Sequence, residues 1–393
     1  MVRSTGQNSL SSAHAWHDAA NRLRHATNDC LGFPSYNGFT PGELDFLLGL
    51  PINNIGDPFL TSRSGTHLHD LERDVLSKVS LLAGLPDTNV RGYVTSGSTE
   101  AVIHALHLGR DTLKMGGAPK PVIIASDQCH GCVVKAARLL DTPFIQVASA
   151  PDGSIDINSF AATLAQHAEN PCLVVATAGT TFLGAIDRTD LMVQALETTH
   201  PSRYRLHVDA ALGGFLLPYT QARGWNLETG GHSYSVSGHK MIGVPVPCGI
   251  VIWHHDAYHL PKDHLDYLCG PDTTLTGSRS GLAVGALWLA LHQWPANRLA
   301  EQAHGCLDRA AILVELLTQA GWPAHRGKYS TTVIFPSPPV DVCTRWQLPT
   351  EGNLAHVVVT PRVDRTLLDR FIASLGTGPG ISSGFLPDHP KLR

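Results

Sequence analysis

Two side chains in this sequence could act together on a small molecule that carries an aldehyde and a cationic ring. Lys240, in SVSGHKMIGVPVPCG, follows a predicted strand and is flanked by small and apolar residues. Such a lysine loses hydration, so its neutral amine is easier to populate and can bond covalently to an aldehyde. Asp209, in LHVDAAL, ends an apolar run, where a lone carboxylate needs a cation such as a pyridinium nitrogen. The ordinary alternatives are a lysine whose amine reaches solvent and an aspartate that caps a helix or pairs with an arginine.

A turn of small residues supplies a third chemical group. The segment YVTSGSTEAVIHAL opens a predicted helix, so its first backbone N–H groups and the hydroxyls of Ser98 and Thr99 suit an anion. Taken alone, the same turn is an ordinary helix N-cap. Together the three segments supply an amine, a carboxylate and a phosphate site, which are the requirements of pyridoxal phosphate.

The predicted elements around these residues alternate between short β-branched runs and helical periods. This alternation is typical of a mainly parallel α/β sheet whose crossover helices cover both faces. We expect the last two strands, which a short segment separates, to form an antiparallel edge. The predicted strands are 122–126, 144–149, 172–178, 206–211, 234–238 and 249–253, and the predicted helices between them are 132–140, 160–168 and 190–199.

The pattern changes after the turn GSRSG at 277–281. A long helical stretch, two strands at 331–335 and 355–360 and a closing helix at 366–375 predict a smaller α+β domain. An amphipathic run over 14–27 and a Gly/Pro-rich stretch precede the large domain. We therefore divide the chain into an N-terminal arm and substrate-side loop (1–60), a large α/β domain (61–285), a small C-terminal domain (286–378) and a tail (379–393).

The composition is that of a globular enzyme. The 393 residues include 43% hydrophobic and 16% charged residues with a net charge of −4, and no dense basic block is present. Nucleic acid and membranes are therefore poor candidates as partners. Eight scattered cysteines indicate free thiols in a reducing, cytoplasmic setting. Cys129 and Cys132 form a C-x-x-C without a second pair, and His255 and His259 lie in a polar loop, so we expect no metal site.

Several segments, in sequence order, resemble group II pyridoxal-phosphate amino-acid decarboxylases. These segments are TSGSTE, DQCHG, ATAGTTFLGAID, HVDAALGGFLLP, SVSGHKMIGVPVPCGIVIW and TLTGSRSG. The similarity runs from about residue 32 to about residue 375 and is strongest toward the histidine decarboxylase and serine decarboxylase branch. It implies the aspartate-aminotransferase fold (fold type I) and a homodimer with its active site at the subunit interface.

The resemblance also implies roles for single residues. Lys240 would bond to the cofactor, Asp209 would pair with the pyridine nitrogen, and His130, in DQCHG, would stack on the ring. Thr181 would lie near the ring. The implied phosphate contacts are Ser98, Thr99, His239, Ser237 and, from the neighbouring subunit, Ser278.

The sequence indicates the substrate-binding residues less clearly than the cofactor-binding residues. The family closes its site with the arm, which implies substrate contacts from Tyr36, Asn53, Asn54 and Asp57. Arg362 occupies a region where glutamate decarboxylases hold a carboxylate with an arginine, although it could also be a solvated surface residue. The candidate donors of a proton to Cα are Tyr267, Lys240 and His239.

Three functional hypotheses remain at this point. The first is decarboxylation of a free L-amino acid to its amine, with histidine as the first candidate substrate and serine as the second. The second is another reaction on the same fold, namely a retro-aldol lyase or an oxidative decarboxylase, because fold does not determine reaction. The third is a binding protein that kept the scaffold without catalysis.

Overall fold

A seven-stranded sheet forms the centre of the computed structural model, which describes residues 12–35, 38–40, 42–86, 90–115, 118–199, 203–294, 297–376 and 378. The strands lie in the order β1-β7-β6-β5-β4-β2-β3, and the five from β6 to β3 are mutually parallel. The predicted fold class, a mainly parallel α/β sheet of fold type I, is confirmed. The strands are β1 (Val90–Thr95), β2 (Val122–Ser126), β3 (Phe144–Val147), β4 (Cys172–Thr177), β5 (Tyr204–Asp209), β6 (Ser233–Ser237) and β7 (Gly249–His254).

The antiparallel end of the sheet differs from the prediction in one respect. β6 and β7 are antiparallel as expected, but β7 is not the edge, because β1 pairs with its other side from Val90 to Thr95. β1 was not predicted. Its sequence, VRGYVT, contains a glycine and an arginine, which weaken the signal of a buried strand.

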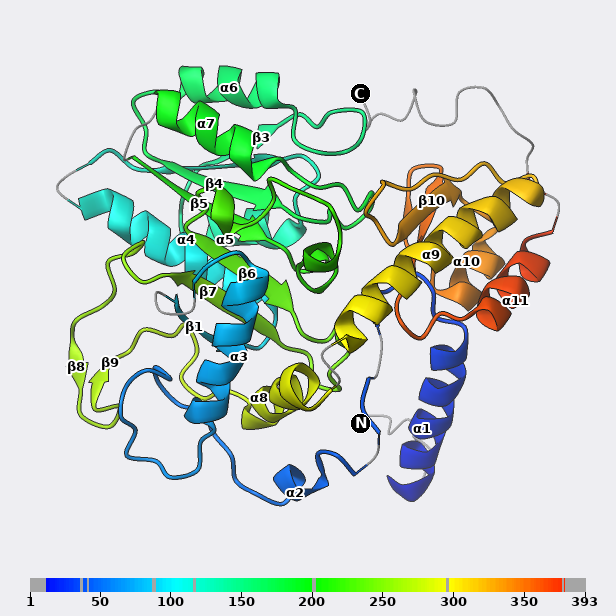
Figure 1. The fold of residues 1–393 in the computed structure, drawn as a ribbon, viewed down its shortest axis with the longest axis horizontal. Coiled ribbons are helices and arrows are strands. Elements are labelled where there is room, and N and C mark those ends of the chain that lie inside the picture. The colour runs from blue at the N-terminus through cyan, green and yellow to red at the C-terminus, as the bar shows by residue number, and fades with distance from the viewer. Residues whose placement is uncertain are drawn as a thin grey trace, which may run out of the picture.

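Helices cover both faces of this sheet (Figure 1). Residues alternate along β2, so Ile123 and Ala125 pack with α4 and α5, whereas Val122 and Ile124 lie in the cluster that contains α6 and α7. The three helices predicted between strands are confirmed as α5, α6 and α7. The helices of this part are α3 (His69–Leu82), α4 (Ser98–Lys114), α5 (Gly131–Leu139), α6 (Ile157–Gln166), α7 (Thr189–Thr199) and α8 (Gly281–Trp288).

Shorter elements connect these layers. They are the hairpin β8 (His264–Leu265) and β9 (Gly270–Pro271), the 3-10 turns η3 (Gly213–Phe215), η4 (Leu217–Tyr219) and η5 (Leu227–Thr229), and the π-helical segment η6 (Leu289–Gln293) that extends α8.

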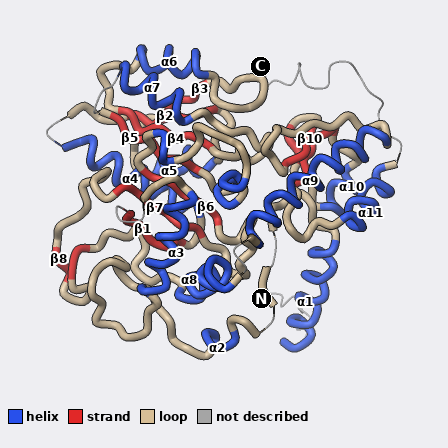
Figure 2. The backbone as a smooth tube through the Cα atoms, in the orientation of Figure 1, coloured by secondary structure: helices blue, strands red, loops and turns tan. Residues whose placement is uncertain are grey.

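The C-terminal part builds a three-stranded antiparallel sheet in the order β10-β12-β11 against three helices (Figure 2). The predicted helix, strand, strand and helix are present, and α10 and β11 are additions. Trp346 and Phe371 pack edge to face in its core, and the Trp346 ring donates a 2.7 Å hydrogen bond to Ser374. The elements are α9 (Arg298–Gln319), β10 (Thr332–Pro336), α10 (Val340–Trp346), β11 (Thr350–Glu351), β12 (Leu354–Val358) and α11 (Arg365–Leu375).

The N-terminal segment passes the three-stranded sheet before it reaches the seven-stranded one. After α1 (Ser12–Asn28), the backbone of Leu31 bonds to Trp346 and Val358 at 3.1 and 2.8 Å. Gly32 follows in a gap where a Cβ would lie 2.1 Å from a carbonyl oxygen, so only glycine fits. This crossing places residues 32–34 beside β12, before the chain continues to α2 (Asp45–Leu48). None of the helices in the described ranges is long and apolar enough to cross a membrane.

Candidate active site

A cavity of about 620 Å³ is lined by residues of both the seven-stranded sheet and the C-terminal three-stranded sheet. Thr177, Asp209 and Ser237, the last residues of β4, β5 and β6, line it, so it opens at the carboxyl ends of these strands, where ligands bind in α/β proteins. The structure brings most of the predicted site residues to this cavity. Those that line it are Ser98, Thr99, His130, Thr181, Asp209, Ser237, His239 and Lys240.

Asp209 is the buried carboxylate of the cavity, with 3% of its surface exposed. Its Oδ1 accepts a 3.1 Å hydrogen bond from the backbone N–H of Ala211. Burial raises the pKa of Asp209, and the charges of Lys240 and His130 oppose that rise. Within the described part of the chain Asp209 forms no ion pair, so a cationic ring nitrogen in the cavity would complete its surroundings.

Lys240 reaches the same cavity from the turn that follows β6. Burial lowers the pKa of its amine, and the negative charge of Asp209 acts in the opposite direction. A lowered pKa makes the neutral, nucleophilic amine easier to populate, which is what covalent attachment to an aldehyde requires.

The first turn of α4 lines one end of the cavity. Ser98, its first residue, lies 2.8 Å from Ser237 through the two hydroxyl oxygens. Glu100 accepts hydrogen bonds from both the N–H and the hydroxyl of Ser96 at 2.8 and 2.7 Å, which fixes the entry to the helix. The backbone N–H groups of this turn therefore stay available for a phosphate.

Glycine at position 249 allows β7 to pass directly beneath this turn. A Cβ at Gly249 would lie 2.7 Å from backbone atoms of Gly97 and Ser98. Any larger residue at 249 would push the anion-binding turn away from the sheet.

His130 is the N-cap of α5, and its Nδ1 accepts a 3.2 Å hydrogen bond from the N–H of Cys132. Burial lowers its pKa, so the ring is neutral with its proton on Nε2. His239 directly precedes Lys240, and its Nδ1 lies 2.8 Å from the carbonyl oxygen of Cys248. Both residues line the cavity.

Thr177 is a cavity residue that the sequence analysis missed. It lies opposite Asp209 in the register of β4 and β5, and its buried hydroxyl has no hydrogen-bond partner within the described residues. The predicted threonine, Thr181, is exposed and lies at the rim of the same cavity. The signal for Thr177 was its place at the end of a strand next to the strand of Asp209.

The structure does not support substrate contacts from Asn54 and Asp57. Asn54 is fully buried and donates a 2.8 Å hydrogen bond to Glu72. Asp57 accepts hydrogen bonds from the N–H of Phe59 and the hydroxyl of Thr273 at 2.8 and 2.7 Å. Both side chains are thus engaged in holding loops together, and neither lines the cavity.

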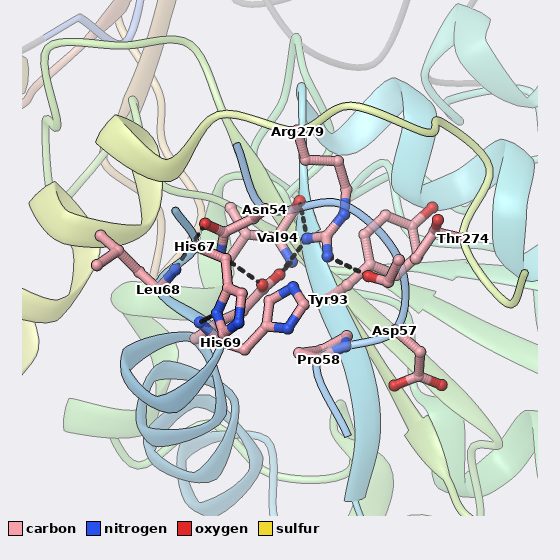
Figure 3. A network of polar contacts seen from close by, with 12 residues as sticks. Asn54, Asp57, Pro58, His67, Leu68, His69, Tyr93, Val94, Thr274 and Arg279 are labelled. Atoms are coloured by element: carbon pink, nitrogen blue, oxygen red, sulfur yellow. Dashed lines mark hydrogen bonds and ion pairs between the residues drawn. The ribbon is translucent and has the colours of Figure 1, made fainter. Parts of the chain in front are cut away.

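Arg279 is the centre of the network that uses Asn54 (Figure 3). Its guanidinium pairs with Glu72, donates to the carbonyl of Gly56 at 2.6 Å and lies over the ring of Tyr93 at 5.1 Å. The sequence motif GSRSG thus turns its arginine inward and leaves its neighbour Ser278 exposed. Asn53 donates a 3.1 Å hydrogen bond to the Ser278 hydroxyl instead of facing the cavity.

The remaining predicted residues lie away from the cavity or outside the described residues. Tyr267 is 62% exposed, and neither it, Arg362 nor Ser278 lines the cavity of this chain. Tyr36 falls outside the described ranges. The arm does contribute to the site, but through Gly32, Phe33 and Pro34.

The C-x-x-C pair consists of free thiols, and burial raises the pKa of both Cys129 and Cys132. Among the described residues, no group of three potential metal ligands comes together.

The residues present fit pyridoxal phosphate. The buried carboxylate of Asp209 suits its ring nitrogen, the Lys240 amine suits its aldehyde, and the first turn of α4 suits its phosphate.

Comparisons with known proteins agree with this fit. Residues 45–320 match the pyridoxal-dependent decarboxylase conserved domain. The chain is 34% identical over 356 residues to serine decarboxylase 1 of Oryza sativa subsp. japonica, covering 90% of this chain and 73% of that protein. It is 32% identical over 359 residues to a histidine decarboxylase of Vibrio campbellii, covering 89% of this chain and 92% of that one.

The solved structure of L-methionine decarboxylase from Streptomyces sp. 590 has the same fold, with a TM-score of 0.85 and 23% identity over 95% of this chain and 96% of that one. The extent of the domain match and the identity to the two curated relatives establish the family. The chain belongs to the pyridoxal-dependent decarboxylases and is a pyridoxal-phosphate-dependent amino-acid decarboxylase.

Proposed function

We propose that the enzyme decarboxylates free L-histidine to histamine, with L-serine as the second candidate substrate. Relatives named for each activity have similar identity, 31–33% for histidine decarboxylases and 33–34% for serine decarboxylases. Identity therefore supports both substrates equally. The shape and charge of the cavity favour histidine.

The wall that the small domain and the arm contribute to the cavity carries the proposal. Its members are apolar or uncharged, namely Gly32, Phe33, Pro34, Pro349, His356 and Val358. In the described part of the lining, Lys240 is the one lysine and there is no arginine, so an acidic side chain would find no fixed cation beyond the cofactor end. The broad apolar surfaces suit a flat ring, which covers them, better than the single carbon of serine.

The chain's own residues can be given roles in this reaction. When bound, pyridoxal phosphate supplies a ring that accepts the electron pair left when carbon dioxide departs. Asp209 would keep the proton on the ring nitrogen, and the Lys240 amine would hold the aldehyde of the cofactor. Of the three candidate donors of the proton to Cα, Lys240 and His239 line the cavity and Tyr267 does not.

We also propose a homodimer whose second subunit completes the site. Ser278 is exposed on this chain and does not line its own cavity. Trp16 and Leu23 on α1 and Phe46 and Leu48 on α2 are large apolar side chains exposed by 63–75% of their surface, which suits burial against another copy. Sedimentation analysis should give a dimer, and a monomer would contradict this part of the proposal.

The substrate assay measures amine, carbon dioxide, ammonia and aldehyde together for each common L-amino acid. Histidine should give histamine and carbon dioxide in equal amounts without ammonia. Ammonia with aldehyde would indicate the oxidative alternative, and glycine or aldehyde without carbon dioxide would indicate retro-aldol cleavage. Turnover of an acidic or an aliphatic amino acid in preference to histidine and serine would contradict the proposed substrates.

A further inference from the structure

Glu100 is a buried carboxylate beside the cavity, and the proposed reaction gives it no role. It lies in the first turn of α4, and 7% of its surface is exposed. Its Oε2 accepts the two hydrogen bonds from Ser96 that fix the entry to the helix, at 2.8 and 2.7 Å. Its Oε1 accepts a 2.9 Å hydrogen bond from the hydroxyl of Thr276 and a 3.2 Å hydrogen bond from that of Tyr93. The carboxylate therefore links the first turn of α4 to the loop that contains Thr276.

This loop comprises residues 272–278, between β9 and Arg279. Tyr93 on β1 also holds it, because the hydroxyl that donates to Glu100 accepts a 3.1 Å hydrogen bond from the N–H of Leu275. Burial and, next, the charge of Glu100 raise the pKa of Tyr93, so the hydroxyl keeps the proton that it donates. The middle of the loop 272–278 is thus fixed to the large sheet by a buried carboxylate and a buried tyrosine.

The same loop connects the cavity to the outer surface of the chain. Leu275 and Thr276 line the cavity, whereas Ser278, two residues after Thr276, does not line it and is exposed. The four residues from Leu275 to Ser278 are all exposed although Thr273 and Arg279 are buried, and Leu275 exposes 40% of its apolar surface. An exposed run that buried groups hold in place fits a surface that a second copy of the chain covers.

We propose that Glu100 is a positioning residue that serves both active sites of the dimer. With Oε2 it holds the first turn of α4, which suits the phosphate of the cofactor in its own subunit. With Oε1 it holds Thr276, and thereby places Ser278 for the cofactor of the neighbouring subunit. The inference rests on the homodimer proposed above and goes beyond it, because it assigns the connection between the two sites to one side chain.

Hybrid dimers test whether Glu100 acts on the neighbouring site. One subunit carries Lys240→Ala, so borohydride can attach the cofactor to position 240 only in the other subunit. Peptide mapping gives the labelled fraction of Lys240 at each concentration of pyridoxal phosphate. The half-saturating concentration then reports cofactor binding in that one subunit without any turnover.

Three substitutions separate the two oxygens of Glu100. Thr276→Val removes a hydrogen bond to Oε1. On the Lys240→Ala subunit it should raise the half-saturating concentration of the other subunit about fivefold, and on the labelled subunit it should have a smaller effect. Ser96→Ala removes a hydrogen bond to Oε2 and should show the opposite dependence on placement. Glu100→Ala removes both connections and should raise the half-saturating concentration in either placement.

Thr163→Val on α6 is the matched control. The Thr163 hydroxyl donates a 2.8 Å hydrogen bond to the carbonyl oxygen of Ser159 in the same helix, and Thr163 does not line the cavity. This variant should leave the half-saturating concentration unchanged in both placements. A general loss of stability would give Thr276→Val and Ser96→Ala the same dependence on placement. Thr276→Val keeps the shape of its side chain, so it decides the question even if Glu100→Ala does not fold.

The outcomes for Glu100, for the dimer and for the substrate are distinguishable. If the protein is a dimer but Thr276→Val and Glu100→Ala affect only the subunit that carries them, the inference is overturned and the dimer stands. A monomer in sedimentation analysis would overturn both. Labelling requires no amino acid, so turnover of serine in preference to histidine would contradict the proposed substrate alone.

Discussion

The hydroxyl oxygens of Ser98 and Ser237 lie 2.8 Å apart and join the first turn of α4 to the end of β6. The first turn of α4 can present backbone N–H groups to an anion. Lys240 follows the last residue of β6 by three positions. One hydrogen bond therefore joins the proposed phosphate site to the strand that leads to the Lys240 amine.

Removing either hydroxyl should weaken binding of the cofactor. We expect Ser98→Ala and Ser237→Ala each to raise the dissociation constant of pyridoxal phosphate about tenfold, because the remaining hydroxyl loses its partner and the turn loses its anchor. The double variant should be less affected than the two single effects combined. Fully additive effects in an absorbance titration would show that the two serines act separately.

Asn53 should position Ser278 for the neighbouring subunit. Its Nδ2 donates to the Ser278 hydroxyl and its Oδ1 accepts from the N–H of Arg279 at 3.2 Å, so the Ser278 proton is left to point outward. The Asn53→Asp variant keeps the side-chain oxygen that accepts from the N–H of Arg279 and loses the side-chain N–H that donates to Ser278. If Ser278 contacts the phosphate of the partner's cofactor, Ser278→Ala and Asn53→Asp should both lower cofactor affinity several-fold.

Hybrid dimers provide the control for that prediction. A Lys240→Ala subunit cannot hold the cofactor covalently, so activity comes from the other subunit. Placing Ser278→Ala on the Lys240→Ala subunit should impair the active partner, and placing it on the active subunit should not. If activity falls only when Ser278→Ala is on the active subunit, a contact of Ser278 across the interface is contradicted.

The buried pair of Arg279 and Glu72 should contribute strongly to stability. Arg279→Met would leave the Glu72 carboxylate buried with only the N–H groups of Val94 and Asn54 as donors. We expect a loss of roughly 3–5 kcal/mol in the free energy of unfolding, measured in urea. Breaking the exposed pair of Arg365 and Asp369 on α11 should cost no more than about 0.5 kcal/mol, and similar losses at both sites would contradict this account.

The sequence predicted those features that depend on local patterns. β2 was predicted to the residue, and the crossover helices α5, α6 and α7 to within a few residues, because apolar periodicity is a short-range property. Lys240 and Asp209 could be found because a polar residue at the end of an apolar run stands out in its own segment.

Features that depend on distant partners could not be predicted. Asn54 lies in a segment that resembles a substrate loop, but its partner Glu72 comes from α3 and its neighbour Arg279 from the turn before α8, more than 200 residues further along the chain. The place of Thr177 in the cavity follows from the register of β4 and β5, and that of His356 from the position of the second sheet at the cavity wall. Neither position can be predicted from the residues of a single sequence segment.

Asp187 should make stability depend on pH in a defined range. It is buried, accepts hydrogen bonds from the N–H groups of Ile155 and Thr177 at 2.6 and 2.7 Å, and burial raises its pKa to about 6 from 3.8. Because the folded-state pKa is the higher one, its stabilising contribution is complete below about pH 4 and is lost as the pH rises through 6.

The Asp187→Asn variant isolates that contribution. The difference in unfolding free energy between wild type and Asp187→Asn should change by up to roughly 3 kcal/mol in favour of the variant between pH 4 and pH 7. A constant difference across that range would show that Asp187 does not titrate with the raised pKa.

The covalent bond to Lys240 is the most direct test of the whole account. Reduction of the cofactor-loaded enzyme with borohydride, followed by peptide mapping, should leave one pyridoxyl group on the Lys240 side chain, and Lys240→Ala should take up none. A pyridoxyl group on another lysine, or no label on enzyme shown to hold pyridoxal phosphate, would contradict it.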